Sequence, residues 1–208
     1  MVLQSRVNRR TFAGLLMACA IGSCGVTGAA FAANTTAGET GVTADSILLG
    51  QSAALSGPTA VLGKQMNAGA HLYFDYINKQ GGVFGRKIEL KALDDMYEPE
   101  EAVKNTKKLI EEDRVFALFG YVGTPTSQAV MPLVNQARIP FFAPFTGAQS
   151  LRDPQSRYVF HVRAGYEEET AAIVRQIRTT GLKRIVVVFN DDAYGRAGLS
   201  GVEHAIKA

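Results

Sequence analysis

The chain has 208 residues, of which 47% are hydrophobic and 20% are charged. This length allows one or two domains, and this composition is typical of a globular protein rather than a disordered or fibrous one. The formal charge is +3, but removing the first 32 residues, which hold three arginines and no acid, leaves 19 basic and 19 acidic side chains. The remaining chain is neutral, so electrostatics gives no case for a nucleic-acid or anionic-membrane partner.

The N-terminus has the pattern of a cleaved export signal. Three arginines are followed by an apolar run over residues 12–21 and by small residues ending in Ala30-Phe31-Ala32, the A-x-A pattern of a signal-peptidase site. We therefore expect a signal peptide over residues 1–32, cleavage near Ala32 and a periplasmic destination. A membrane anchor is the competing interpretation, but the continuous apolar part is too short to span a bilayer.

Two details leave the export route open. Residues 8–12 resemble a twin-arginine signal, the alternative being general secretion, and the strings ending at Cys19 and Cys24 resemble a lipoprotein box with an acylated cysteine. The chain has two cysteines, and both lie in this segment. Cleavage after Ala32 would remove disulfides, cysteine zinc sites and thiol nucleophiles together.

From residue 45 onward, strand and helix patterns alternate. Residues 33–44 are small, polar and without period, which is typical of a linker. Apolar strands are predicted at 47–52, 87–94, 115–119, 140–143 and 158–163. Helices are predicted at 63–80, from Pro99 onward and at 125–138, with a short helical turn at 148–151. This alternation indicates an α/β fold with a doubly wound parallel sheet.

The pattern starts again after this first set of strands. A helix, a β-branched strand and a further helix are predicted at 166–179, at 183–189 and after Gly195. One strand with two helices cannot bury both faces of a sheet, and Ala208 falls inside the last predicted helix without a stop signal. We therefore expect a complete first lobe over residues 45–163 and the start of a truncated second lobe over 164–208.

Three loops at the carboxyl ends of predicted strands carry hydroxyl side chains, and ligands of open α/β sheets bind at this edge. These loops contain Ser56, then Tyr121 and Thr124, then Thr146. The helix starts that follow offer unpaired N–H groups and a positive dipole end, so the loops suit a small carboxylate. Each serine or threonine could instead simply cap a helix, but three at one edge favour a binding site.

Other chemistry has weaker support. Asp94-Asp95 could act as an acid/base pair, hold a ligand ammonium or form a surface turn, and we favour the turn. His71, His161 and His204 lack the spacing of metal ligands, so we expect no metal and no other cofactor. The sequence has no P-loop and no G-x-S-x-G motif, and no G-x-G-x-x-G joins a predicted strand to a helix. We therefore expect no catalysis.

Several segments together carry a family resemblance. They are Leu55-Ser56-Gly57-Pro58, residues 77–87, Asp94-Asp95 with Pro99 and residues 102–103, and Asp191-Asp192-Ala193-Tyr194-Gly195. In this order and spacing, the chain from about Gly41 onward resembles the periplasmic leucine/isoleucine/valine-binding protein family, the substrate-binding components of branched-chain amino acid ABC transporters. The resemblance implies two α/β lobes, joined by a hinge, that close on a ligand.

The resemblance also implies roles for individual residues. Thr124 matches a hydroxyl residue whose side chain and N–H bind the ligand α-carboxylate. Phe145 matches a position that offers its carbonyl to the ligand ammonium, and Tyr194 matches an aromatic residue that covers the ligand. The family's acidic residue for the ammonium would lie beyond Ala208.

Two positions depart from the family pattern. Gly147 stands where the family has a threonine, although Thr146 is adjacent, and Leu62 stands where leucine-binding members have an aromatic residue. Because a missing donor can change ligand preference, other hydrophobic amino acids, amides, urea and aromatic acids stay open.

We therefore expect a non-catalytic, exported protein that captures a small amino acid or a related carboxylate or amide. Its expected partner is an ABC permease in the inner membrane. A ligand-sensing domain of the same fold is the alternative, and an exported hydrolase is a weaker one.

Overall fold

The computed structural model describes residues 39–208. The predicted export signal, both cysteines and the first part of the linker lie outside the described residues. Five strands form one parallel sheet in the order β2-β1-β3-β4-β5. The strands are β1 (Ser46–Ala53), β2 (Lys87–Asp94), β3 (Ala117–Phe119), β4 (Phe141–Phe142) and β5 (Val159–Phe160). The predicted parallel α/β sheet is confirmed.

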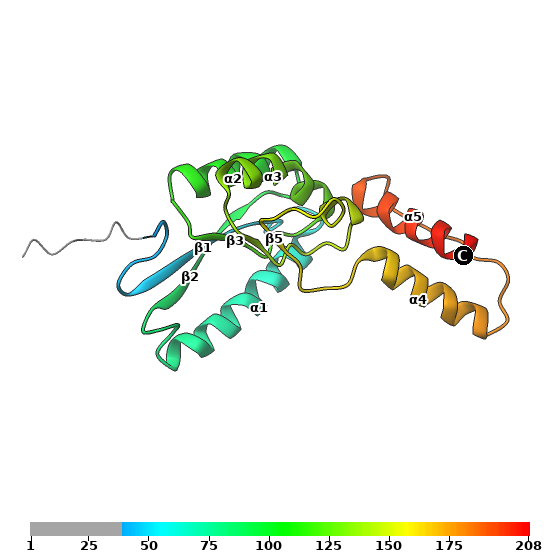
Figure 1. The fold of residues 1–208 in the computed structure, drawn as a ribbon, viewed down its shortest axis with the longest axis horizontal. Helices are drawn as coiled ribbons and strands as arrows, with labels where there is room; N and C mark the ends of the chain where they lie inside the picture. The colour runs from blue at the N-terminus through cyan, green and yellow to red at the C-terminus, as the bar shows by residue number, and fades with distance from the viewer. Residues whose placement is uncertain (1–38) are drawn as a thin grey trace, which may run out of the picture. The chain divides into compact units, whose positions relative to one another are not determined.

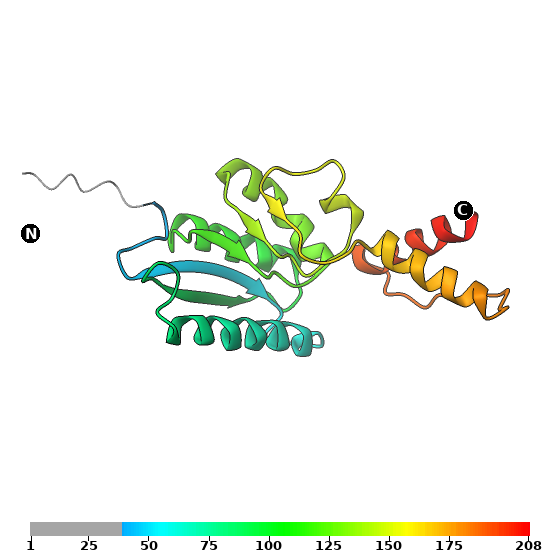
Figure 2. The same cartoon turned by 60° about the horizontal axis from the view of Figure 1, so that its bottom comes forward.

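Helices cover both faces of this sheet (Figures 1 and 2). Helix α1 (Ala60–Lys79) lies on one face, and α2 (Pro99–Glu111) and α3 (Thr124–Ala137) pack side by side on the other. The strand order reverses direction at β1, because β2 lies on one side of it and β3 on the other. The loops after β1 and β3 therefore leave the sheet towards opposite faces, which opens a crevice at its carboxyl edge.

The core lies between the sheet and the α2–α3 layer. Leu109 of α2 and Val130 and Val134 of α3 are fully buried with Leu118 and Phe141 of the sheet. Helical spacing in the sequence predicts that these three helix residues are buried, and the structure confirms it. Each such side chain contributes about 1.5–3 kcal/mol by leaving water.

Helical spacing in the sequence also predicts a buried face of α1 that includes Leu62, Ala70, Tyr73 and Phe74, and this prediction is only partly correct. Ala70 and Phe74 are buried, whereas Tyr73 and Leu62 are exposed. Helix α1 covers its face of the sheet alone, so only a narrow stripe of its residues touches the strands. Leu62 remains available at the carboxyl edge of the sheet.

After β5 the chain forms α4 (Tyr166–Thr179) and α5 (Ala193–Lys207), which lie side by side and run in the same direction (Figures 1 and 2). The predicted strand at 183–189 is wrong, since the structure has no strand there. Val186 and Val188 are 88% and 95% exposed. A strand needs the backbone groups of a neighbour, and no other strand lies beside this segment within residues 39–208.

Within the same described range, no helix combines the length and the apolar character needed to cross a bilayer.

Candidate functional site

A cavity of about 660 Å³ lies at the carboxyl edge of the sheet. The loop after β3 contributes Val122 and Gly123 to its wall, and the loop after β4 contributes Phe145. On the opposite side, Tyr166 of α4 and Tyr194 of α5 complete the wall. The crevice that the strand order predicts is therefore a real cavity, with the α4–α5 pair facing the first lobe across it.

Three of the eight predicted site residues line this cavity: Leu62, Phe145 and Tyr194. Tyr194 is 45% exposed, and its ring meets the ring of Tyr166 edge to face, with 5.6 Å between centroids and 71° between planes. Such a pair fixes the orientation of both rings. Tyr194 thus stands where a covering aromatic side chain is expected.

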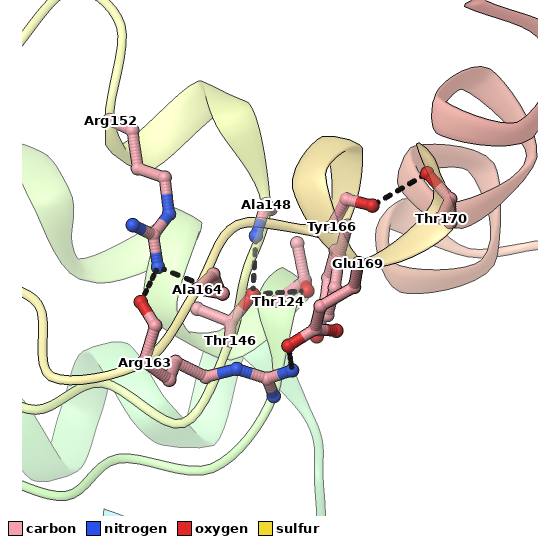
Figure 3. Close-up of polar contacts among 9 residues, drawn as sticks. All are labelled: Thr124, Thr146, Ala148, Arg152, Arg163, Ala164, Tyr166, Glu169 and Thr170. Atoms are coloured by element: carbon pink, nitrogen blue, oxygen red, sulfur yellow. Dashed lines mark hydrogen bonds and ion pairs between the residues drawn. The ribbon is translucent and has the colours of Figure 1, made fainter. Parts of the chain in front are cut away.

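The hydroxyl groups of Thr124 and Thr146 bind each other instead of facing the cavity (Figure 3). Their oxygens are 2.7 Å apart, both residues are buried, and Thr146 Oγ1 also accepts the N–H of Ala148 at 3.1 Å. Neither residue caps a helix, because Gly123 holds the N-cap of α3 and Ala148 that of the short 3₁₀ helix Gln149–Leu151. This pair ties the loop after β4 to the first turn of α3.

The structure leaves no room at Gly147 for the threonine that the resemblance implies. A Cβ atom there would lie 2.7 Å from the ring of Tyr166 and 2.9 Å from its backbone nitrogen. The carbonyl of Gly147 also accepts the N–H of Tyr166 at 2.7 Å. Tyr166 therefore occupies the space that a side chain at position 147 would need.

Ser56 and Tyr121 do not line the cavity. The Ser56 hydroxyl donates to Asp94, whose carboxylate also accepts the N–H groups of Leu55 and Met96 at 2.8 and 2.9 Å. Burial pushes the pKa of Asp94 upward, but these hydrogen bonds outweigh it and leave the pKa below its usual value. Tyr121 is fully buried in the core, where its hydroxyl pairs with Thr106 at 2.9 Å and burial raises its pKa.

The predicted surface turn at Asp94-Asp95 is only partly correct, because Asp94 ends β2, Asp95 is fully buried and the turn itself follows at residues 96–97. Asp95 also places a wall residue that the sequence analysis missed. Asp95 is fully buried, accepts the Ser52 hydroxyl at 2.7 Å and the Tyr97 N–H at 2.9 Å. Burial raises the pKa of Asp95 despite these bonds. Tyr97 has a left-handed backbone with φ 70° and lines the cavity.

The ring of Tyr97 lies directly against Gly123. A Cβ atom at Gly123 would come within 2.5 Å of that ring, and Gly123 itself has φ 109°. Only glycine fits both requirements. Burial, and after it the charge of Asp192, raises the pKa of the Tyr97 hydroxyl to about 12. A tyrosine two residues after a carboxylate turn was the available signal for this position.

An ion pair between Arg163 and Glu169 is the second feature that the sequence analysis missed (Figure 3). Both residues line the cavity. The guanidinium carbon of Arg163 lies 5.5 Å from the ring centroid of Phe145 and 5.1 Å from that of Tyr166. Arg152 Nη2 donates to the carbonyls of Arg163 and Ala164 at 2.9 and 3.2 Å, which holds this segment in place.

The described residues offer no cluster of three or more His, Cys, Asp or Glu side chains that could hold a metal ion. His161 bonds the carbonyl of Leu151 through Nε2 at 3.0 Å, and burial lowers its pKa.

A parallel α/β lobe with a ligand-sized cavity at the carboxyl ends of its strands is the arrangement typical of α/β ligand-binding folds. Residues 46–208 match the family described as periplasmic binding protein. The chain belongs to this family, which confirms the resemblance seen in the sequence.

Named relatives are binding proteins of about twice this length. The chain is 28% identical over 166 residues to Leu/Ile/Val-binding protein homolog 3 of Brucella melitensis, a match covering 78% of this chain and 43% of that protein. It is similar to the crystal structure of a possible leucine/isoleucine/valine-binding protein from Rhodopirellula baltica, with 39% identity, a TM-score of 0.76, and 81% and 46% of the two chains covered.

A second similar structure carries a ligand. It is the solute-binding protein of an ABC transporter from Rhodopseudomonas palustris in complex with 3,4-dihydroxybenzoic acid. The identity is 27% and the TM-score 0.70, with 78% of this chain and 44% of that chain covered. The chain thus spans less than half the length of each of these three proteins.

Proposed function

We propose that this protein is an extracytoplasmic solute-binding protein that captures a small amino acid or a related carboxylate or amide for an ABC importer. The cavity at the carboxyl edge of the sheet carries this proposal. Its volume of about 660 Å³ falls in the range of roughly 300–1,000 Å³ that small-molecule sites occupy. Its walls are mostly apolar and aromatic, with few polar groups, as such sites are.

The arrangement of the walls supports capture by closure. Leu62 and Phe145 come from the first lobe, and Tyr166 and Tyr194 come from helices on the other side of the cavity. A ligand that contacts both sides favours the closed arrangement over an open one. Closure removes water from the ligand and so strengthens its polar contacts.

Binding without catalysis fits the disposition of the carboxylates. Asp94 and Asp95 are the pair considered for acid/base catalysis. Their carboxylate oxygens accept hydrogen bonds from backbone N–H groups and from the hydroxyls of Ser52 and Ser56. Neither lines the cavity. The remaining parts of the proposal, namely the signal over residues 1–32, cleavage near Ala32 and delivery to an inner-membrane permease, follow from the sequence and from the names of the relatives.

Calorimetric titration of the full chain against amino acids, amides and organic acids tests the proposal. Tyr194→Ala should weaken binding of whichever solute binds by about tenfold or more, because it removes a covering ring. Tyr76→Ala is the matched control, since Tyr76 is 57% exposed on α1 and does not line the cavity. Equal losses in both variants, or no binding of any solute, would contradict the proposal.

A further inference from the structure

The guanidinium of Arg163 has more N–H donors at the cavity wall than Glu169 uses. A guanidinium carries five N–H donors. Within residues 39–208, the hydrogen bond of this guanidinium goes from Nη2 to Glu169 (Figure 3). The side chains of Arg163 and Glu169 are 27% and 37% exposed, so the pair is partly withdrawn from water but still reachable from the cavity. A carboxylate entering the cavity can accept from the N–H groups that Glu169 leaves free.

The surroundings of Arg163 orient its guanidinium so that it can bind an anion. Its guanidinium lies over the rings of Phe145 and Tyr166, and Arg152 fixes its backbone through the Arg163 carbonyl. Ring faces attract a cation and orient its plane without consuming the donors at its edge. A planar, pre-oriented fork matches the two oxygens of a carboxylate.

The walls favour a flat ligand body. Five aromatic side chains line the cavity: Tyr97, Phe145, Tyr166, Phe189 and Tyr194. Aromatic rings pack well against other rings in stacked or edge-to-face arrangements. A planar aromatic body therefore gains more from these walls than a branched aliphatic side chain does.

The charged side chains of the described wall suit a ligand carboxylate. Among the described residues, Arg163 and Glu169 are the two charged side chains that line the cavity, and Glu169 already accepts from Arg163. A ligand carboxylate can therefore be held by the guanidinium of Arg163.

We propose that Arg163 binds the ligand carboxylate and that this cavity selects a planar aromatic monocarboxylate over an aliphatic amino acid. The inference rests on the proposed function and names the ligand class of the same cavity. The incoming carboxylate shares the guanidinium with Glu169, whose own negative charge opposes it.

Calorimetric titration of the full chain with benzoate, 3,4-dihydroxybenzoate, benzamide and L-leucine tests this inference. At least one of the two benzoates should bind about tenfold or more tightly than benzamide, which keeps the ring but lacks the charge, and than L-leucine. Arg163→Gln should weaken benzoate binding by about 10–100-fold, as the loss of a charge-assisted contact does. Arg175→Gln, an exposed position on the same helix α4, should leave it unchanged.

The sign of the Glu169 effect separates the two ligand classes. Glu169→Gln removes the opposing charge, so it should tighten benzoate binding several-fold, whereas it would weaken a ligand that places its ammonium there. Glu168→Gln makes the same charge change on the same turn, outside the cavity wall, and should have no effect. Arg163→Lys keeps the charge but loses the forked guanidinium, so its benzoate affinity should lie between those of wild type and Arg163→Gln. It also serves as the test variant if Arg163→Gln folds poorly.

Specific results would overturn the inference. Equal benzoate affinity in Arg163→Gln and Arg175→Gln, or weaker benzoate binding in Glu169→Gln, would exclude the role of Arg163. Tight L-leucine binding that Tyr194→Ala abolishes and Arg163→Gln leaves unchanged would refute this ligand class while supporting the proposed function. Absence of binding for all four probes and for the wider panel would overturn both.

Discussion

Replacing Asp95 tests the link between a buried carboxylate and the cavity wall. Asp95 is fully buried and accepts hydrogen bonds from the hydroxyl of Ser52, itself fully buried, and from the N–H of Tyr97. Asp95→Ala leaves two donors without a partner, each at a cost of about 1–3 kcal/mol. The free energy of unfolding should therefore fall by about 2–5 kcal/mol. Asp95→Asn keeps an acceptor for Tyr97 and should cost much less.

The pH dependence provides a second, independent readout. Burial raises the pKa of Asp95, so the folded protein holds this proton more tightly than the unfolded chain does. The contribution of Asp95 to stability is therefore largest at pH values below both pKa values and falls as the pH rises through the folded-state value. Asparagine does not titrate, so wild type should gain stability relative to Asp95→Asn as the pH falls from neutral into the acid range. The opposite shift of Asp94 is present in both proteins and cancels.

Urea unfolding of the full chain, followed by far-UV circular dichroism at several pH values, measures both effects. Asp75→Asn on the exposed side of α1 is the control for the loss of one carboxylate. A loss in Asp95→Ala no larger than in this control would refute the hydrogen-bond argument. A difference between wild type and Asp95→Asn that stays constant with pH would refute the burial argument.

Two further predictions concern the frame around the cavity. Gly147→Ala should displace Tyr166, lower the free energy of unfolding by about 1–3 kcal/mol and weaken ligand binding. Gly69→Ala, where a Cβ atom would meet nothing within 4 Å, should stabilise the protein by about 0.5–1 kcal/mol. Thermal unfolding measures the stability of both variants. If both glycine variants behave alike, the close approach at position 147 is wrong. Thr124→Val and Thr146→Val should each destabilise by about 1–3 kcal/mol, because each breaks the buried bond between the two hydroxyls, and Thr146→Val also removes the acceptor of the Ala148 N–H. The double variant should lose less than the sum, and strict additivity in chemical unfolding would show that the two hydroxyls do not interact.

Sequence patterns predict this fold well where the signal is local. Helical periodicity places Leu109, Val130 and Val134 in the core, as the structure confirms. The alternation of short apolar runs with helices also predicts the parallel sheet, since few other arrangements bury both faces of such strands. The segment 183–189 fails for the opposite reason: its β-branched residues favour a strand, but strand formation depends on a neighbour that local sequence does not report.

The site was predicted only in part, because side-chain direction depends on distant contacts. Leu62, Phe145 and Tyr194 line the cavity, and the family resemblance is what pointed to these three positions. The position of Tyr97 was not predicted, because the direction of its side chain depends on a left-handed backbone and on the hydrogen bond from its N–H to a buried carboxylate. The position of Arg163 was not predicted, because it depends on contacts with aromatic rings and on the ion pair with Glu169 in the first turns of α4.

A crystal structure of the full chain with its tightest-binding organic acid tests the central claim most directly. The account predicts that the ligand lies in the cavity between Phe145 and Tyr194, with its carboxylate within hydrogen-bonding distance of the Arg163 guanidinium. A ligand bound outside this cavity, or one whose carboxylate points away from Arg163 towards the first turn of α3, would contradict it.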